Sequence, residues 1–466
     1  MRDPMPASKE MARRSSVVCL LCFVVVTASC DGDPPKIPAG SDGGVSVNDT
    51  SFDSVIADSA DAGAAEDGND AGTDGADSTS DNTDGGDGGD GAADAVLSAP
   101  GPVWLPLGVT AIDASGHSLP LSVTVASNDR FLAIRVRPAQ PDPSAPWCFA
   151  IEDVVLPDGS VWIQPLSSKL GAGSQSNGSQ RALPQHGYGV FVLPNDGVSA
   201  LPDGVIHFRV VLRDCRYDIP VTRVDGGANQ GGLYAKLAKS VVVEFAHEAA
   251  FAANAQPRLE IRIAISALSG INVDTLATND GWTKAIAAAQ AIFASAGVTL
   301  TIGRVAAFEA PSILTYGPGM RTELDAAYDS ALTALTDNTA ERSLRFVPVM
   351  IVRCLLRDTP IGGLQTYAGQ TTRLPGGAPF GASASGVFIS TLDCTQPSLA
   401  LSGSKLGFIL AHELGHHLGL LHTNTPLGEQ RSESGVTDVM QSTSSAIAFT
   451  AKQAAAMRRH FDVTVQ

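Results

Sequence analysis

Three histidines and one glutamate near the C-terminus have the spacing of a metal centre. The segment AHELGHHLGLLHT contains His412, Glu413, His416, Gly419 and His422 in the pattern HExxHxxGxxH. On a helix, positions i and i+4 lie on one face, so the first two histidines can bind the same ion. The glutamate that follows the first ligand can reach a water molecule on the metal without binding the metal itself. Three protein ligands and one open position are typical of catalytic zinc.

The rest of the motif predicts how the chain leaves this helix. Gly419 can adopt a left-handed backbone conformation at the helix end, and the chain can then turn back to bring in His422 as the third ligand. His417 is next to a ligand, so its side chain points about 100° away and it is not expected to bind the ion. Four of the nine histidines fall within eleven residues, which disfavours an ordinary amphipathic helix.

This arrangement predicts hydrolysis by a water molecule that zinc activates. Zinc held by three imidazoles lowers the pKa of a bound water toward ~7. Glu413 is then the expected base for that water, and the acid that protonates the leaving amine. Replacing Glu413 by Gln should leave zinc bound and abolish turnover.

The motif resembles that of the metzincin zinc endopeptidases. Metzincins carry a methionine turn below the zinc, and the segment TDVMQST places Met440 eighteen residues after His422. The segments GLLHT at the third ligand, GVFIS upstream and FTAKQAAAMRRHF downstream look most like the pappalysin-like group. The resemblance covers roughly Arg258 to Phe461, and it is specific at the helix and the methionine turn and weak elsewhere. Matrixin-like and reprolysin-like members share the same core motif.

The resemblance implies an α/β (α+β) zinc peptidase domain, which we place at residues 255–466. One catalytic zinc would be its cofactor, with Met440 forming an apolar floor under the three imidazoles. In metzincins an edge strand before the active helix pairs with extended substrate, and residues 386–391 occupy the corresponding place in the sequence.

Hydrophobic patterns predict the elements that position the motif. The active helix is expected to begin after Ser402 or Ser404 and to pack Leu406, Ile409 and Leu410 inward. A final helix is expected behind the site, with Thr450 as its cap. A larger set of elements precedes them: strands at 258–266, 298–305, 344–356 and 386–391, a helix at 282–296 capped by Asn279 or Asp280, and a helix at 321–335.

Residues 99–250 predict a separate β-rich domain. Short strand-like runs such as RFLAIRVRPA and GVIHFRVVLRD alternate with turn signals such as PDG and PND. Regular short strands with Gly and Pro between them favour an antiparallel sandwich-like domain. No catalytic pattern lies in it, so its role as a spacer, a substrate- or glycan-binding module or a prodomain stays open.

The first 30 residues predict an export signal. A mildly basic start precedes a short apolar run from Val17 to Val26, too short to span a bilayer of ~30 Å. The run ends in VTASC, which resembles a bacterial lipobox with Thr27 in the place of the usual Leu. Cys30 would then carry the lipid that anchors the mature protein to a membrane of the cell envelope or to the cell surface. Ordinary signal cleavage and secretion are the alternative.

Residues 31–98 predict a disordered acidic linker. It holds 17 acidic residues and one lysine, a net charge of −16 out of −17 for the whole chain. Such a segment buries too little apolar surface to fold, and its charges keep it extended. The net negative charge of the chain therefore belongs to this linker and does not indicate an acidic binding surface. Runs such as DGGDGGDG match neither an EF-hand nor a nonapeptide repeat, so the sequence gives no clear motif for structural Ca²⁺.

The remaining cysteines favour two disulfides inside the proposed domains. Pairing Cys148 with Cys215 and Cys354 with Cys394 is the one connectivity of three that keeps each bond within a domain. The alternative is a free Cys148 whose thiolate caps the zinc in a latent zymogen, although its context matches no known switch motif.

We therefore expect an exported zinc endopeptidase that acts on extracytoplasmic protein or peptide substrates. One alternative is a surface adhesin or glycan-binding lipoprotein with an inactive zinc domain. The other is a zinc hydrolase of non-peptide substrates, because the motif constrains the activated water more than the substrate. No basic cluster beyond RRH near the C-terminus and no phosphate-binding loop suggests a nucleic-acid partner.

Overall fold

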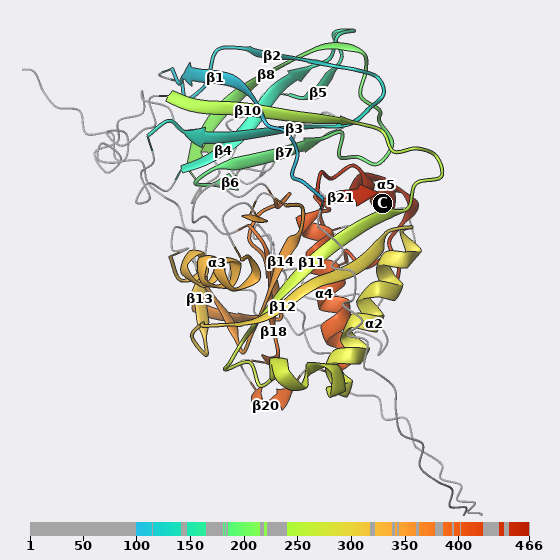
Figure 1. The fold of residues 1–466 in the computed structure, drawn as a ribbon. Coiled ribbons are helices and arrows are strands. Elements are labelled where there is room, and N and C mark those ends of the chain that lie inside the picture. Colours follow the sequence, from blue (N-terminus) through green and yellow to red (C-terminus); the bar gives the residue numbers. More distant parts are fainter. Residues whose placement is uncertain are drawn as a thin grey trace, which may run out of the picture. The chain divides into compact units, whose positions relative to one another are not determined.

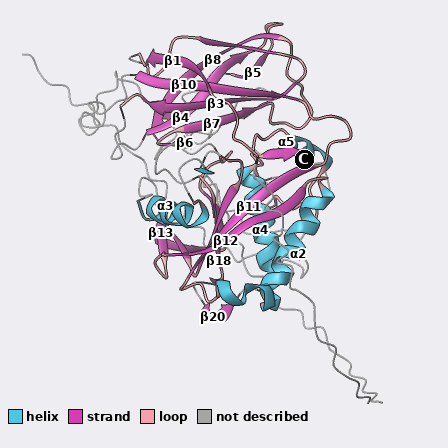
Figure 2. Ribbon diagram, in the orientation of Figure 1, coloured by secondary structure: helices cyan, strands magenta, loops and turns pink. Residues whose placement is uncertain are grey.

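The computed structural model describes residues 99–465 with gaps, and strands make up most of its regular structure (Figure 2). The residues outside the description within that range are 114, 141–146, 165–179, 181, 183–184, 215–218, 221–239, 317–321, 338–340, 343, 360–362, 378–384, 394–395, 401, 423–437 and 442–446. The described residues belong to one compact unit. None of their helices is both long enough and apolar enough to cross a bilayer.

Two antiparallel sheets face each other in the first part of the chain (Figure 1). One has the order β1 (Leu105–Ala111), β10 (Ser240–Ala249), β3 (Asp129–Pro138) and β7 (Gly189–Leu193). The other has the order β2 (Leu121–Val125), β8 (Gly204–Asp214), β4 (Trp147–Val155) and β5 (Val161–Ile163), with β6 (Gln185–His186) on β4 and β9 (Ile219–Pro220) on β8.

Alternation along these strands builds a shared core. Leu132, Ile134 and Val136 of β3 point to the same side, as expected for a strand with a period of two. They are fully buried against apolar side chains of the second sheet, such as Phe149 and Phe208. This part of the chain is therefore sandwich-like, as its sequence predicts. The domain boundaries themselves stay a prediction.

A mixed sheet of six strands occupies the second part of the chain. Its order is β12 (Thr299–Phe308), β11 (Pro257–Ser266), β14 (Val347–Val352), β18 (Val387–Ser390) and β17 (Gly369–Thr371), and β21 (Val463–Val465) also pairs with β11. The first four strands are parallel, whereas β17 and β21 run antiparallel to their partners.

The expectation that residues 386–391 form the substrate-pairing edge strand is wrong. Val387–Ser390 is the inner strand β18, hydrogen-bonded to β14 on one side and to β17 on the other. Both of its sides are paired and its four residues are buried, so it offers no free edge to another strand. The edge strand on this side of the sheet is instead β17, which lies earlier in the sequence.

The helices lie on both faces of this sheet (Figure 1). They are the 3₁₀ helix η1 (Val273–Thr278) and the α-helices α2 (Asp280–Ser295), α3 (Thr322–Leu335), α4 (Gly403–His417) and α5 (Ala451–Arg458). Leu259, Ile261 and Ile263 of β11 point into the core that holds α2 and α4, whereas Ala264 packs with α3 on the other face. Asn279 caps α2 as predicted, through a bond from Trp282 N.

Two smaller sheets complete the description. β13 (Leu314–Tyr316), β15 (Leu355–Thr359) and β16 (Gly363–Tyr367) form one, and β19 (Leu392–Asp393) and β20 (Gln396–Ala400) form the other. The single strand predicted at 344–356 is thus divided: β14 stays in the mixed sheet, and β15 begins a different sheet three residues later.

The structure describes only one cysteine of each predicted disulfide, Cys148 and Cys354. Cys148 and Cys354 are buried, with exposed fractions of 5% and 6%, and neither is a free thiol. The idea of a free Cys148 capping the zinc is therefore wrong. Cys215 and Cys394 lie outside the described residues, so their pairing with Cys148 and Cys354 stays a prediction.

Candidate metal centre

Helix α4 carries the first two histidines and begins where the sequence predicts. Ser402 is its N-cap, and the Ser402 side chain accepts a hydrogen bond from Lys405 N at 3.3 Å. Ser and Thr are favoured at this position because they satisfy a backbone N–H that the first turn leaves open. Leu406, Ile409 and Leu410 are buried in the core beneath it, as expected.

Two glycines let α4 approach α2 closely. A Cβ atom on Gly403 would lie 2.3 Å from the carbonyl oxygen of Gly281, and one on Gly407 would lie 2.3 Å from that of Ala285. Real side chains do not fit at such distances. These glycines therefore set the distance between α4 and α2, and with it the position of the histidines that α4 carries.

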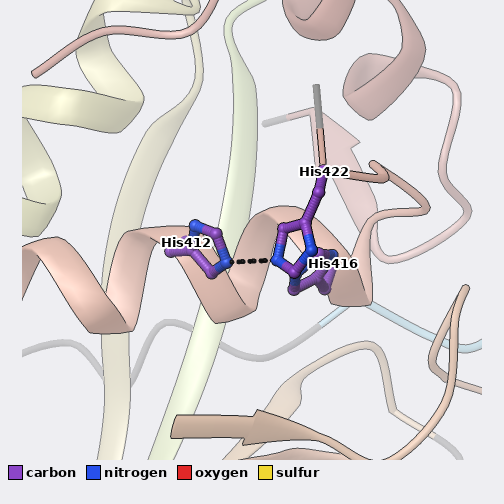
Figure 3. A group of neighbouring side chains, drawn as sticks. All are labelled: His412, His416 and His422. Carbon is purple, nitrogen blue, oxygen red and sulfur yellow. Dashed lines mark hydrogen bonds between the residues drawn. The ribbon is translucent and has the colours of Figure 1, made fainter. Parts of the chain in front are cut away.

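The three histidines of the motif converge (Figure 3). His422 Nε2 lies 3.1 Å from His412 Nε2 and 3.0 Å from His416 Nε2. Candidate ligand atoms of the three residues all lie within 4.8 Å of one another, and no other such group of three or more His, Cys, Asp or Glu side chains occurs among the described residues. For comparison, nitrogens bound to one tetrahedral zinc at 2.0–2.1 Å are about 3.3 Å apart.

Backbone carbonyls fix which nitrogen of each ring faces this point. Nδ1 of His412 lies 2.7 Å from the carbonyl oxygen of Val439, and Nδ1 of His416 lies 2.7 Å from that of Leu420. A carbonyl oxygen only accepts, so each Nδ1 must carry the hydrogen and each Nε2 must present a lone pair. Such bonds also orient metal-binding imidazoles.

The donor set fits a cation. Burial lowers the pKa of all three imidazoles, and the neighbouring histidines lower those of His416 and His422 further, the latter to about 3. In their neutral form, His412 and His416 each point an Nε2 lone pair at Nε2 of His422, and that nitrogen can donate at most one hydrogen. A metal ion satisfies all three nitrogens at once, so His412, His416 and His422 could hold one.

Gly419 ends the helix in the predicted conformation. Its φ is +89°, in the left-handed region that strains other residues. The Gly419 N–H bonds the carbonyl oxygen of His416, and Leu420 N–H bonds that of Gly415. These bonds reverse the chain within a few residues and return His422 to the helix.

Met440 lies against the same helix. It is fully buried, and its Sδ atom lies 2.6 Å from where a Cβ on Gly415 would be. Asp438 holds the turn, since its Oδ1 accepts from Met440 N at 2.8 Å and from Gln453 Nε2 at 2.9 Å. Gln453 belongs to α5, so the final helix supports the turn beneath the site. Thr450 and Gln453 cap that helix reciprocally.

Glu413 is buried beside the edge strand β17. Its exposed fraction is 6%, and its Oε2 lies 2.8 Å from Thr371 Oγ1. A Cβ on Gly369 would lie 2.9 Å from its Oε1, so strand and carboxylate are in close contact. The expected role of Glu413 as acid and base stays a prediction.

His417 points away from the metal ligands but is not at the surface. It is fully buried, and its Nε2 lies 2.9 Å from Asp462 Oδ2. Burial would raise the pKa of Asp462, but the bond from His417 and the nearby His460 hold it below its ordinary value. The same helical turn thus contacts a metal site on one side and a buried carboxylate on the other.

Sequence reasoning missed several residues of this site. Thr371 and Asp462 contact the motif from 42 and 45 residues away in the sequence, and Asp438 bonds Met440 in the methionine turn. A carboxylate next to the methionine turn was a usable signal for Asp438, since turns favour Asp. Nothing in the local sequence marks Thr371 or Asp462.

Comparison with known proteins gives little beyond this geometry. No model of a known protein family matches the chain, and no curated protein matches it. Among solved structures it is similar to metalloproteinase-II from Bacteroides fragilis, with 16% identity and a TM-score of 0.25 over 42% of this chain. The match spans about half (49%) of that chain. A likeness this weak carries no argument about function.

Proposed function

We propose that this protein is a zinc-dependent endopeptidase of the metzincin type, most like the pappalysin-like group. The observation that carries the proposal is the convergence of three imidazole nitrogens that a single cation could share. Glu413, next to the first of them in sequence, supplies a buried carboxylate. A closed structural zinc site would use four protein ligands, whereas three leave a position for water.

Each residue then has a defined task. His412, His416 and His422 would hold zinc, which when bound lowers the pKa of water toward about 7 and polarises the scissile carbonyl. Glu413 takes a proton from the attacking water as the new C–O bond forms. It then gives that proton to the amine nitrogen as the C–N bond breaks. Protein and peptide substrates outside the cytoplasm are the expected targets.

The test compares the purified full chain with its Glu413→Gln variant. We expect about one zinc per chain by elemental analysis in both proteins. We also expect cleavage of a mixed peptide library that falls roughly 10²–10⁴-fold in kcat in the variant, because the general base is lost while the ligands remain. A variant that cleaves at the wild-type rate would contradict the role of Glu413, and a wild type without zinc would contradict the metal site.

A chelator provides the matched control. Removing zinc from the wild type should abolish cleavage, and adding zinc back should restore it. One bound zinc without cleavage of any peptide would favour a non-peptide substrate.

We also propose that the protein is exported and anchored through a lipid on Cys30. The support is the N-terminal sequence alone, since these residues lie outside the described part of the chain. Fractionation of cells that express the wild type or Cys30→Ser tests it. Equal release of both proteins into the medium would contradict the anchor.

A further inference from the structure

The edge strand β17 contacts Glu413 through two residues on the same face. Residues i and i+2 of a strand point to one side, so Gly369 and Thr371 both face helix α4. Thr371 Oγ1 lies 2.8 Å from Glu413 Oε2 and 2.6 Å from the Glu413 carbonyl oxygen. The hydroxyl thus lies within hydrogen-bond distance of two oxygens of the same residue, one on the carboxylate and one on the helix backbone, and its single hydrogen is shared between them.

Gly369 leaves the space that the carboxylate chain occupies. A Cβ there would lie 2.6 Å from Glu413 Cγ and 2.8 Å from Ile409 Cγ2. Even an alanine would therefore press on the side chain of Glu413. Gly369 therefore packs against the middle of the Glu413 side chain, and Thr371 is hydrogen-bonded to its carboxylate.

β17 is held by strand pairing on one side and by contacts of the residues that follow it in the chain. Gly369 and Thr371 are paired with Ile389 and Val387 of β18. The residues that follow β17 are bonded to the β-rich part of the chain. Arg373 donates a hydrogen bond to the backbone carbonyl oxygen of Tyr188 at 2.8 Å, and its guanidinium lies 3.6 Å from the centroid of the Tyr188 ring. A group that contacts Glu413 from such a strand has little freedom to move.

We infer that β17 orients the Glu413 carboxylate and that Thr371 is a positioning residue for the base. The inference rests on the proposed function. A glutamate side chain has several rotatable bonds, and proton transfer requires its oxygen to be within hydrogen-bond reach of the water. A hydroxyl bond to one oxygen and a glycine beside the other select one orientation before substrate arrives.

The test is Thr371→Val in the full chain, with Thr371→Ser as the conservative variant. Valine keeps the shape and removes the hydroxyl, whereas serine keeps the hydroxyl. We expect kcat to fall roughly 10–100-fold in the valine variant, as for other groups that orient catalytic residues. KM and zinc content should stay unchanged, because neither the metal ligands nor substrate contacts are altered. The serine variant should recover most of the lost kcat.

Thr372→Val is the matched control. Thr372 is the neighbouring buried threonine, and its hydroxyl lies within hydrogen-bond distance of Gly386 N and O rather than Glu413. We expect its kcat to stay at the wild-type value. Gly369→Ala is a second test that keeps the hydroxyl and displaces Glu413, and it should also lower kcat with zinc bound.

Two outcomes would overturn the inference and leave the proposed function standing. One is a wild-type kcat in the zinc-loaded Thr371→Val protein, and the other is an equal loss of kcat in Thr371→Val, Thr371→Ser and Thr372→Val. A wild type that cleaves no peptide would overturn the proposed function and the inference together.

Discussion

His412 and His416 divide their two ring nitrogens between the protein and a shared point. In each ring Nδ1 is bonded to a backbone carbonyl, which leaves Nε2 as a lone pair in a buried environment. Burial keeps these rings neutral, so few protons compete with the metal near neutral pH. The ligands are thus in the state that zinc requires before it binds.

His460, a buried histidine outside the metal site, gives the protein a measurable pH dependence. Burial lowers the pKa of His460 to about 3, against about 6.5 in an unfolded chain. As pH falls below 6.5 the unfolded chain therefore takes up a proton that the folded protein does not. The free energy of unfolding should fall by about 1.4 kcal/mol per pH unit from this residue, and above pH 6.5 the effect is absent.

Denaturant unfolding at several pH values between 7 and 5 measures this. His460→Asn keeps an acceptor for the Asp462 N–H and removes the titrating ring. With chelator in both samples the metal-binding imidazoles contribute equally to both curves. The variant should lose less stability on acidification than the wild type, and parallel curves would contradict the assignment.

Prediction from sequence succeeded where chemistry is local. The spacing of His412, His416 and His422 is fixed by helix geometry and one glycine, so it predicted their convergence. The bond between His417 and Asp462 joins residues 45 positions apart, and no periodicity relates them. This hydrogen bond forms only because the C-terminal segment packs against α4, and that packing depends on the tertiary structure.

At the scale of elements, α4 is held between α2 and the methionine turn by residues without side chains. Gly403 and Gly407 face α2, and Gly415 faces Met440. The distance from α4 to α2 is therefore set by contact between backbones, and its distance to the methionine turn is set by the Met440 side chain against the α4 backbone. Because His412 and His416 lie on α4, the packing of this helix also determines where their side chains are.

Gly415→Ala tests this packing. Its Cβ would lie 2.6 Å from Met440 Sδ and 3.2 Å from Phe449 Cε1, so the buried Met440 side chain must shift. We expect the free energy of unfolding to fall by roughly 1–3 kcal/mol, as for other overpacked cores. Zinc affinity should also fall, because Val439, which orients His412, is next to Met440.

Gly281→Ala is the control for a glycine-to-alanine change in a helix. Gly281 is exposed, and a Cβ there would approach only Asn279 Oδ1, at 3.4 Å. We expect no loss, or a gain of up to roughly 1 kcal/mol from helix propensity, and no change in zinc affinity. Equal effects of the two substitutions would contradict the packing argument.

Element prediction failed where strand order matters. The sequence located the buried strand at 387–390 but assigned it to the edge, because a hydrophobic run does not reveal its neighbours. The true edge strand, β17, has only three residues, and its sequence GQT carries no strand pattern. Helix starts were predicted well, since Asn279, Ser402 and Thr450 act through local caps.

At the scale of the molecule, the β-rich part is bonded to the C-terminal segment behind α4. Arg130 of β3, only 7% exposed, donates to the carbonyl oxygens of Arg458, His460 and Val463 at 2.8–3.0 Å. It also pairs with Glu248. Burial lowers the pKa of Arg130 to about 10, which still leaves it charged at neutral pH.

Arg130→Met should therefore destabilise the whole protein. The change removes a buried charge, leaves Glu248 with Arg345 as its remaining partner, and leaves three carbonyl oxygens without this donor. We expect a loss of roughly 3–5 kcal/mol in the free energy of unfolding. Thermal and denaturant unfolding of the full chain measure the effect.

Arg135→Met is the matched control on the same strand. Arg135 pairs with Glu244 within its own sheet, and its guanidinium lies 4.3 Å from the Trp104 ring centroid. Its loss should cost roughly 1 kcal/mol, as for a partly exposed pair. Equal losses for the two arginines would contradict a special role for Arg130 contacts with the C-terminal segment.

These contacts bear on what a protease could do to the chain itself. The only direct connection from β10 to β11 is residues 250–256, which are mostly exposed. A single cut there would sever the covalent link yet leave the contacts of Arg130, Arg345 and Phe461 in place. The nicked protein would remain a two-piece complex with an intact metal site. Maturation by cleavage alone would then not separate the pieces, and shedding the β-rich piece would require those contacts to dissociate.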